Sequence, residues 1–346
     1  MKKLLAILLS AALILCLAAC GAGGANNGGE DDGLTLALVV AGNFGDRSFY
    51  DSSNEGATRL EAEGITVKRI ECGNEKHTEQ IYNAADVADI VVLVGWEFYD
   101  VEAVAPEYPD VKFIALDVAK GDLLEGGVAL KGESYDYNPD NWDLSKYVNM
   151  SNVYCAIYQE ELAGYMAGYA AVKLGYTKLG FLGGMAVPAV IRYGYGFVQG
   201  VDAAAKELNI NVDMNYIYGG QFFGDADITA VMDTWYKGGT EVVFACGGGI
   251  YTSAAEAAKK AGGKVIGVDV DQSAIIDGAY GEGMTVTSAM KGLAPTTIDT
   301  LTDVLINDKW DDYKGKIETL GLVSGDDASL NYVQIPATTQ FVDGKF

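Results

Sequence analysis

Short apolar segments alternate with amphipathic ones along most of the chain. Several of the apolar segments are hydrophobic at consecutive positions, which is typical of strands buried on both faces of a parallel sheet. The predicted strands are residues 34–40, 65–70, 90–94, 112–116, 179–182, 241–245, 264–268 and 284–288. Apolar residues with helical spacing predict helices at residues 53–63, 78–88, 159–174, 196–208, 225–237, 252–261 and 295–306. This alternation predicts an α/β protein built from βαβ units.

The pattern indicates two such sheets. It restarts at residue 179, after a stretch at residues 131–149 that has no clear period. A length of 346 residues, at roughly 150 residues per domain, agrees with two domains.

The N-terminal segment has the form of a secretory signal. Lys2 and Lys3 precede an apolar run that ends in Leu17-Ala18-Ala19-Cys20. This ending resembles the bacterial lipobox, which implies a signal peptide at residues 1–19 and a lipid on the thiol of Cys20. Residues 20–33 are rich in Gly, Asn and acidic residues and read as a flexible tether. We therefore expect a lipid-anchored protein at the extracytoplasmic face of the cell membrane. The alternative is an uncleaved anchor or an ordinary signal.

The charge excludes some classes of partner. Lys and Arg total 24 and Asp and Glu total 48, which gives a net charge of −24. Such a chain would be repelled by a nucleic-acid polymer, while a hydrophobic fraction of 49% excludes general disorder. One His, and Cys72, Cys155 and Cys246 at spacings that match no metal template, predict neither a metal site nor a His-based triad. No cofactor is expected.

Ligands of open α/β sheets bind beyond the carboxyl ends of the strands. Glycines there let backbone N–H groups approach a ligand, aromatic rings stack on flat groups, and carboxylates accept hydrogen bonds. The segments that follow predicted strands are residues 42–49, 95–98, 117, 183–185, 247–250, 269–272 and 291.

Several of these segments, in the same order, resemble the basic membrane protein family of bacterial lipoproteins. They include Asp46-Arg47-Ser48-Phe49, Val94-Gly95-Trp96-Glu97-Phe98, Tyr108-Pro109-Asp110-Val111-Lys112-Phe113 followed by Asp117, Glu161-Leu162-Ala163-Gly164-Tyr165, Gly180-Phe181-Leu182-Gly183-Gly184-Met185, Arg192-Tyr193-Gly194-Tyr195-Gly196-Phe197, Gly267-Val268-Asp269-Val270-Asp271-Gln272 and Ser288-Ala289-Met290-Lys291. The better-understood members of this family are purine-nucleoside receptors of ABC importers.

The resemblance implies a type I periplasmic binding protein fold, with two Rossmann-like α/β lobes, a hinge and a ligand between the lobes. The N-terminal lobe is expected at residues 34–150 and 285–315, and the C-terminal lobe at residues 151–284 and 316–346. The implied partners are a purine nucleoside (adenosine, guanosine or inosine) and the subunits of an ABC permease. The implied function is binding, without catalysis.

The resemblance also implies roles for residues that would meet the base. Phe49 and Tyr193, the latter where the family usually has Phe, would stack on its two faces. Asp46 and Asp117 would meet its polar edge, where a carboxylate favours N–H donors. Trp96 would line the wall of the cleft. For the two aspartates, the alternative from the sequence alone is a turn or helix-capping role.

Asp269 and Lys291 would bind the ribose in the same family. A carboxylate bonded to two vicinal hydroxyls discriminates against ligands that lack them. Gly247 and Gly248 would present backbone N–H groups.

The chain departs from the family in the segment of residues 118–151, which is longer than usual. It carries four large aromatic residues, namely Tyr135, Tyr137, Trp142 and Tyr147. We expect it either to cover the cleft, to contact a transporter, or to be a surface elaboration.

Other functions were weighed. Gly247-Gly248-Gly249 imitates a dinucleotide-binding loop and suggests an oxidoreductase, but Thr252 stands where the third Gly is needed. A calcium-dependent nucleoside hydrolase would need an Asp cluster larger than Asp269 and Asp271. A receptor for a sugar or another small molecule on the same fold, or a sensor without a transporter, remains as the alternative.

Overall fold

The computed structural model describes residues 34–73 and 76–340. The predicted signal peptide, tether and lipidation residue Cys20 lie outside these residues. No helix in the described ranges is both long and apolar enough to cross a membrane.

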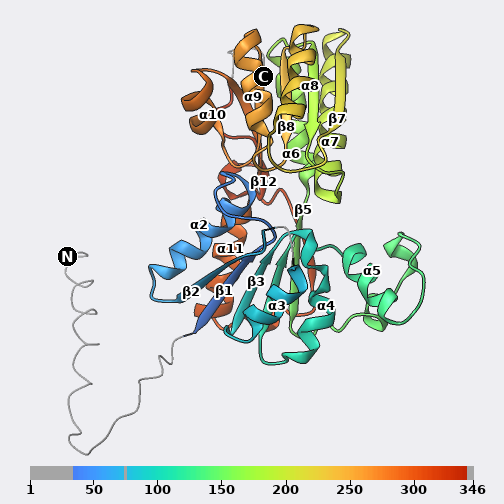
Figure 1. Cartoon of the computed structure of the whole chain (residues 1–346), viewed down its shortest axis with the longest axis vertical. Helices are drawn as coiled ribbons and strands as arrows, with labels where there is room; N and C mark the ends of the chain where they lie inside the picture. Colours follow the sequence, from blue (N-terminus) through green and yellow to red (C-terminus); the bar gives the residue numbers. More distant parts are fainter. Residues whose placement is uncertain (1–33, 74–75, 341–346) are drawn as a thin grey trace, which may run out of the picture. The chain divides into compact units, whose positions relative to one another are not determined.

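The first sheet contains six strands, all joined in parallel (Figure 1). Its strand order is β11 (Ile317–Leu320), β5 (Val153–Tyr158), β4 (Lys112–Leu116), β3 (Ile90–Val94), β1 (Thr35–Val40) and β2 (Thr66–Glu71). Alternate residues of β1 point to opposite faces of the sheet. Leu36 and Leu38 belong to a core cluster with α2 (Phe49–Glu61) and α11 (Leu293–Leu301). Ala37 and Val39 pack with α3 (His77–Ala85), α4 (Val101–Val104) and α5 (Lys120–Leu130) on the other face.

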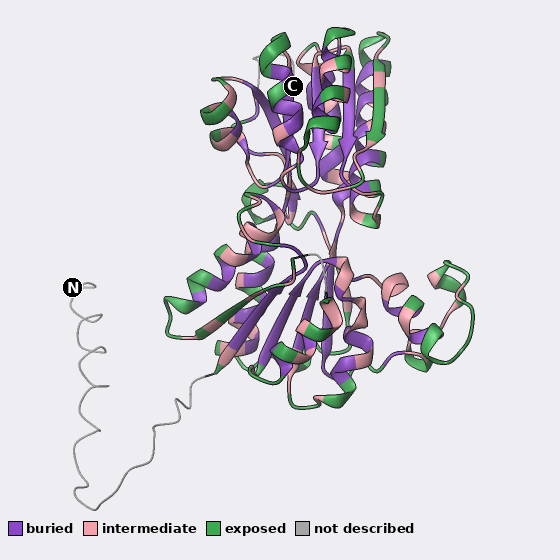
Figure 2. Cartoon of the chain, viewed as in Figure 1, coloured by how far each residue is buried: buried purple, intermediate pink, exposed green. Residues whose placement is uncertain are grey.

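The second sheet repeats this strand order. It runs β12 (Val333–Gln334), β10 (Thr285–Lys291), β9 (Lys264–Asp269), β8 (Val242–Cys246), β6 (Lys178–Gly183) and β7 (Asp213–Tyr218), and only β12 is antiparallel. Helices α6 (Glu160–Lys173) and α7 (Pro188–Leu208) pack on one face. Helices α8 (Ala226–Lys237), α9 (Tyr251–Ala261) and α10 (Ser273–Tyr280) cover the other face. Figure 2 shows that the central strands are buried, while the outer faces of the helices are exposed.

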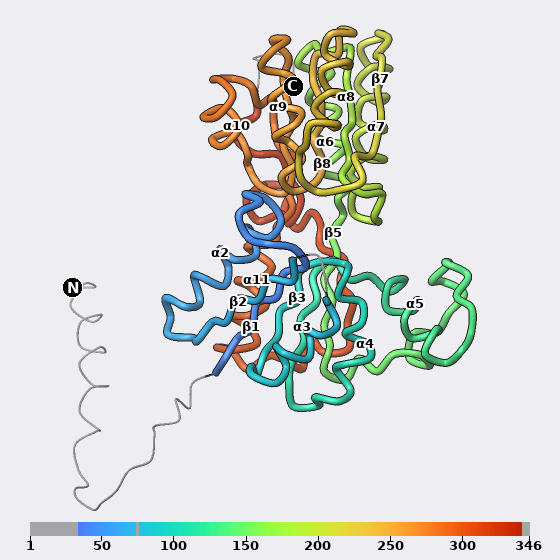
Figure 3. Tube along the Cα trace, in the orientation of Figure 1, coloured from blue at the N-terminus to red at the C-terminus, as the bar shows by residue number. Residues whose placement is uncertain are grey.

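The chain passes between the two sheets three times, in segments that are distant in sequence (Figure 3). The crossings are at Gln159, at Gly292 and at residues 321–332. Backbone hydrogen bonds join them: the Gln159 N–H donates to Leu320 O at 2.9 Å, and the Gly292 N–H to Tyr332 O at 2.7 Å. The three crossings therefore form one hydrogen-bonded connection.

The α/β prediction is confirmed, and each predicted strand is found within three residues of its predicted ends. Four strands were missed: β5, β7, β11 and β12. Helix α7 begins at Pro188 rather than at residue 196, and helices α4, α5 and α10 were not predicted.

The predicted lobe boundaries do not match the sheets. β5 was assigned to the C-terminal lobe but pairs with β4 in the first sheet. β10 was assigned to the N-terminal lobe but pairs with β9 in the second sheet, and β11 pairs with β5 in the first. The prediction placed each lobe boundary before one of these strands. In the structure the chain crosses to the other sheet only after the strand, so β5, β10 and β11 each belong to the sheet that the chain then leaves.

Candidate ligand-binding site

A pocket lies where the carboxyl ends of strands from both sheets meet. All nine residues predicted to bind ligand line it. Asp46, Phe49, Trp96 and Asp117 come from the first sheet and its helices, and Tyr193, Gly247, Gly248, Asp269 and Lys291 from the second.

Asp117 and Asp269 occupy corresponding positions in the two lobes. Asp117 follows β4 and Asp269 ends β9, and each of these strands is the fourth from the β2 or β7 edge of its sheet. Both have left-handed backbone conformations, with φ of 67° and 65°. Aspartate tolerates this region better than most residues, and strain of this kind concentrates at functional sites. The repeated fold thus directs one carboxylate from each lobe toward the pocket.

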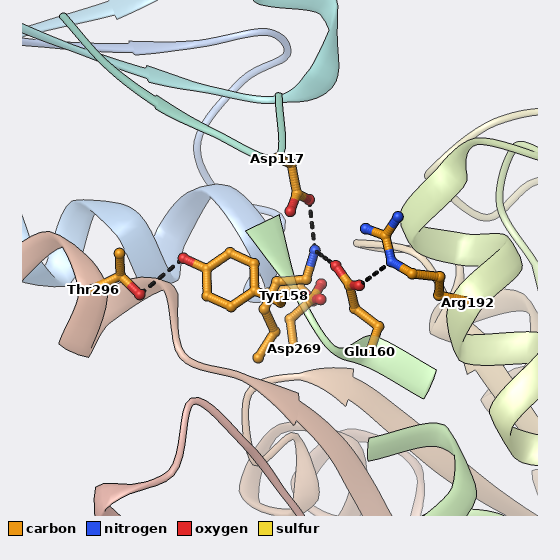
Figure 4. A network of polar contacts seen from close by, with 8 residues as sticks. Asp117, Tyr158, Glu160, Arg192, Asp269 and Thr296 are labelled. Atoms are coloured by element: carbon orange, nitrogen blue, oxygen red, sulfur yellow. Dashed lines mark hydrogen bonds and ion pairs between the residues drawn. The ribbon is translucent and has the colours of Figure 1, made fainter. Parts of the chain in front are cut away.

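Lys291 is the centre of a buried charge network (Figure 4). Its ammonium donates to Asp117 Oδ2 at 2.5 Å and lies 3.0 Å from Glu160 Oε1. Glu160 Oε2 in turn accepts from Arg192 Nε at 2.6 Å. Because Asp117 belongs to the first lobe and the other three to the second, the network joins the two lobes across the pocket.

Electrostatics keep Lys291 charged. Burial by itself would lower the pKa of Lys291, but the carboxylates of Asp117, Glu160 and Asp269 outweigh it and raise that pKa. Asp269 behaves differently: burial raises the pKa of Asp269 to about 6, although Lys291 and the Ser48 hydroxyl both oppose this rise. The Ser48 hydroxyl donates to Asp269 Oδ2 at 2.7 Å, while Oδ1 receives no hydrogen bond from the residues that the structure describes.

Asp46 also organises its own loop. Its carboxylate accepts backbone N–H groups from Ser48 and Tyr50 at 3.0 Å and from Asp51 at 3.1 Å. These bonds hold the turn that leads into α2, and so the turn role weighed from the sequence is present. The same side chain lines the pocket, because a carboxylate has acceptor capacity beyond three hydrogen bonds.

Aromatic rings surround the lysine. The Lys291 ammonium lies 5.0 Å from the ring centroid of Phe49, 5.3 Å from that of Tyr158 and 5.9 Å from that of Tyr193. Tyr193 is 2% exposed and also packs edge-on against Phe244 in the core. It therefore serves the core as well as the pocket wall.

Three buried polar atoms of pocket-lining residues have no hydrogen-bond partner among the described residues: Trp96 Nε1, Asp117 Oδ1 and the Tyr193 hydroxyl. Buried polar atoms in proteins are nearly always paired. The site thus offers a donor, an acceptor and a hydroxyl to a polar ligand.

Gly247 and Gly248 form a turn that only glycine enters readily, with φ of 148° and 49°. The Phe222 ring packs against this turn: a Cβ on Gly247 would lie 2.9 Å from Phe222 Cδ1, and one on Gly184 would lie 2.4 Å from it. Phe222 therefore reaches the pocket because glycines make room for it.

Sequence reasoning missed several of these residues. Phe222 lies in a bend after the missed strand β7, where no periodicity marks it. Glu160, which is fully buried, is the first residue of α6, and an acidic residue there normally signals only the helix dipole. Arg192 was noted as part of a family segment but without a role.

The aromatic segment of residues 131–149 does not cover the pocket, since no pocket-lining residue lies between 118 and 152. Its aromatic residues contact one another instead. The ring centroids of Trp142 and Tyr135 are 5.7 Å apart, and those of Trp142 and Tyr147 are 5.3 Å apart. Asp136 Oδ1 accepts from Trp142 Nε1 at 2.6 Å and so fixes the segment internally.

The described residues contain no group of three or more His, Cys, Asp or Glu side chains placed to hold a metal ion. Three acids of the pocket, Asp46, Asp117 and Asp269, instead accept hydrogen bonds from backbone N–H groups, a lysine ammonium and a serine hydroxyl, respectively. The arrangement fits recognition of a small polar molecule that also has a flat apolar part.

Comparisons with known proteins agree with this architecture. Basic membrane protein A of Borreliella burgdorferi is 28% identical over 247 residues, which cover 69% of this chain and 64% of that protein. The ABC transporter nucleoside-binding protein BmpA of Lactococcus lactis is 26% identical over 259 residues, with the same two shares. The match thus spans slightly less than two thirds of the length of these relatives.

A solved ABC transporter solute-binding protein from Aeropyrum pernix K1 superposes with a TM-score of 0.68 at 21% identity, covering 88% of this chain and 76% of that one. This likeness shows a shared fold. A family model described as "ABC transporter substrate-binding protein PnrA-like" matches residues 34–325. The resemblance read from the sequence segments is confirmed, and the chain belongs to the family of PnrA-like ABC transporter substrate-binding proteins.

Proposed function

We propose that this protein binds a purine nucleoside in the pocket between its lobes and delivers it to an ABC permease. The observation that carries the proposal is the composition of the pocket. Aromatic rings and a separate group of charged side chains line one cavity, and they come from the strand ends of both lobes. A nucleoside has the same two parts, a flat base and a polar sugar.

Phe49, Tyr193, Trp96 and Phe222 provide the aromatic surface for the base. Stacking of a base on such a ring is worth about 1–3 kcal/mol. Phe49 and Phe222 come from different lobes, and a ligand that contacts both lobes favours the arrangement in which they are together.

Asp269 and Lys291 are assigned to the ribose. The free oxygen of Asp269 would accept from a vicinal hydroxyl, and the charge of Lys291 opposes the rise in the pKa of Asp269 that burial causes. A phosphate in place of a sugar hydroxyl would meet a pocket lined by the carboxylates of Asp46, Glu97, Asp117 and Asp269, so nucleotides are expected to bind poorly.

The sequence of residues 1–33 supports a lipid anchor on Cys20 and a tether, which would hold the receptor at the extracytoplasmic face of the membrane. The relative from Lactococcus lactis is named as nucleoside-binding, which supports the ligand class.

Calorimetry on residues 34–346 tests the proposal, with adenosine, guanosine, inosine, cytidine, free adenine and ribose as ligands. We expect a purine nucleoside to bind with a Kd below about 10 μM, and adenine or ribose alone to bind much more weakly, because each lacks half of the contacts. Binding of a free sugar, with no purine nucleoside reaching that affinity, would contradict the proposal and favour a sugar receptor.

Asp269→Asn tests the ribose assignment. Asparagine tolerates a φ of 65° and keeps the shape of the side chain, so the fold is expected to persist. We expect the affinity for nucleosides to fall by about tenfold or more, because a hydrogen bond to a charged group is lost. Asp271→Asn, two residues further on and outside the pocket, is the matched control. Equal affinities of the two variants would make Asp269 a structural residue.

A further inference from the structure

One carboxylate of the pocket has no partner on another residue. Asp46, Glu97, Asp117 and Asp269 all line the pocket. The three aspartates are held by backbone N–H groups, by a lysine ammonium and by a serine hydroxyl, respectively. Within the described part of the chain, Glu97 receives only a hydrogen bond from its own backbone. Its acceptor capacity is therefore available to a ligand.

The local fold holds Glu97 in this position. It lies in the short 3-10 helix η1 (Trp96–Asp100), directly after β3 and Gly95. Its carboxylate lies over the bare backbone of Gly95, where a Cβ would be 2.5 Å from Glu97 Oε2. The Gly95 N–H donates to Leu116 O at 3.1 Å, so it is engaged elsewhere.

Among the residues that the structure describes, no basic side chain forms an ion pair with Glu97. The charged and titratable groups that interact with it are Asp117, Tyr50 and Cys72. The basic side chains of the network, Lys291 and Arg192, are engaged by Asp117 and Glu160. A carboxylate that is partly removed from water costs free energy unless a hydrogen-bond donor contacts it.

A hydrogen-bond donor lies next to Glu97 in the sequence. Trp96 lines the same pocket, and its indole N–H is buried without a partner. The two residues together present one donor and a carboxylate with two acceptor oxygens. The complementary edge of a ligand is one acceptor followed by two N–H donors.

We propose that Glu97, with Trp96 beside it, is the specificity-determining residue that selects a 6-oxopurine with a 2-amino group. The inference rests on the proposed nucleoside function and narrows it. In guanosine the 6-oxo group accepts, and the ring N1–H and the 2-amino group donate. Inosine lacks the second donor. Adenosine presents a ring acceptor and a single donor amino group, which leaves one carboxylate oxygen unpaired.

The test compares the affinities of guanosine, inosine and adenosine for the wild-type protein and for Glu97→Gln, by calorimetry at pH 8. For the wild type we expect guanosine to bind tightest and adenosine weakest. In Glu97→Gln one acceptor becomes a donor, so guanosine is expected to lose about tenfold or more in affinity. Adenosine is expected to hold or gain affinity, because an amide matches its donor–acceptor edge.

Glu102→Gln is the matched control. Glu102 is also buried and acidic, it lies five residues further along the chain, and it does not line the pocket. It is expected to leave the guanosine-to-adenosine ratio unchanged. A damaged fold would weaken all three ligands by the same factor, so the ratio reports on specificity alone.

Two results would overturn the inference. They are a wild-type preference for adenosine, and a guanosine-to-adenosine ratio that is unchanged in Glu97→Gln. In each of these cases nucleosides still bind and the proposed function stands. If no nucleoside binds to the wild type, the proposed function fails and this inference fails with it.

Discussion

At the residue scale, we expect Glu97 to make ligand binding depend on pH. Burial raises the pKa of Glu97 to about 7, and the charge of Asp117 adds to this. Only the ionised form accepts two N–H donors, so guanosine affinity is expected to be highest above pH 7 and to fall as the pH drops toward 5.5. Burial also raises the pKa of Asp46, and that of Asp269 to about 6, so both contribute to the same trend.

The difference between the wild type and Glu97→Gln isolates the effect of Glu97. Calorimetry at pH 5.5, 6.5, 7.5 and 8.5 is expected to show guanosine affinities that converge at low pH and diverge at high pH. If the affinities of the wild type and of Glu97→Gln changed in parallel with pH, the pH dependence would come from Asp46 and Asp269 instead.

Glu102 makes the stability of the first lobe depend on pH. It is 6% exposed, and burial raises its pKa from 4.5 to about 7, with the charge of Asp100 adding to this. The folded state thus holds the proton more tightly than the unfolded state. This contribution is complete below pH 4.5 and is lost as the pH rises through 7.

Glu102→Gln removes the ionisation and is expected to raise the free energy of unfolding by about 1–3 kcal/mol at pH 8, with little effect at pH 4.5. Denaturant melts at both pH values measure this. Glu63→Gln, at an exposed position, serves as the control and is expected to have no effect at either pH. An equal gain at both pH values would contradict a cause in ionisation.

At the scale of elements, glycines let helices α6 and α7 approach closely. Gly164 and Gly168 lie on α6, and Gly196 and Gly200 lie on α7, each pair one turn apart. A Cβ on Gly196 would lie 1.9 Å from Glu161 O, which is backbone and cannot turn aside. The contact fixes α6 and α7 against each other, and these helices carry the Glu160 and Arg192 of the charge network.

Gly196→Ala is expected to lower the free energy of unfolding by about 1–3 kcal/mol, because overpacking exceeds the helix-propensity gain. Gly278→Ala is the control. It lies inside α10, a Cβ there meets nothing within 4 Å, and this change is expected to stabilise slightly. Chemical denaturation of both variants measures the contrast. Stabilisation of both would show that the helices separate freely.

The strands that the sequence predicted and those that it did not differ in how apolar they are and in whether turns mark their ends. Central strands such as β3 are apolar at every position and are flanked by turns, so they were found. β7 is an edge strand with mostly exposed residues, and its pattern is weak. β5 is apolar but only Gln159 separates it from α6, so no turn marks its end.

The site was predictable only in part, for a similar reason. Residues that follow strong strands, such as Asp117, were placed by the rule that ligands bind at strand ends. Phe222 reaches the pocket from a loop, and Glu160 joins the charge network from a helix start. Both are placed by tertiary packing, and neither has a local signal. Glu97 lay within a recognised segment, but its lack of a partner is visible only in the structure.

At the scale of the whole molecule, net charge sets the response to salt. A charge of −24 on one chain produces self-repulsion that opposes the compact state. Salt shortens the range of this repulsion to about 8 Å at 0.15 M. We therefore expect Tm to rise as NaCl increases from 10 mM to about 0.2 M and then to level off. A Tm that rises only above about 0.5 M would indicate a general salt effect on hydration instead.

The same experiment separates the fold from the site. A nucleoside carries no net charge, so its affinity is expected to stay within about twofold over this range of salt, while Tm changes. Differential scanning fluorimetry and calorimetry on the same samples measure both quantities. A steep loss of affinity with salt would mean that the ligand is a cation drawn in by the acidic surface, because only a charged ligand is steered by that field. A gain in affinity with salt would instead indicate an anion, which the carboxylates repel at low ionic strength. If the ligand is neutral, the acidic surface affects the stability of the fold, and the pocket alone determines which ligand binds.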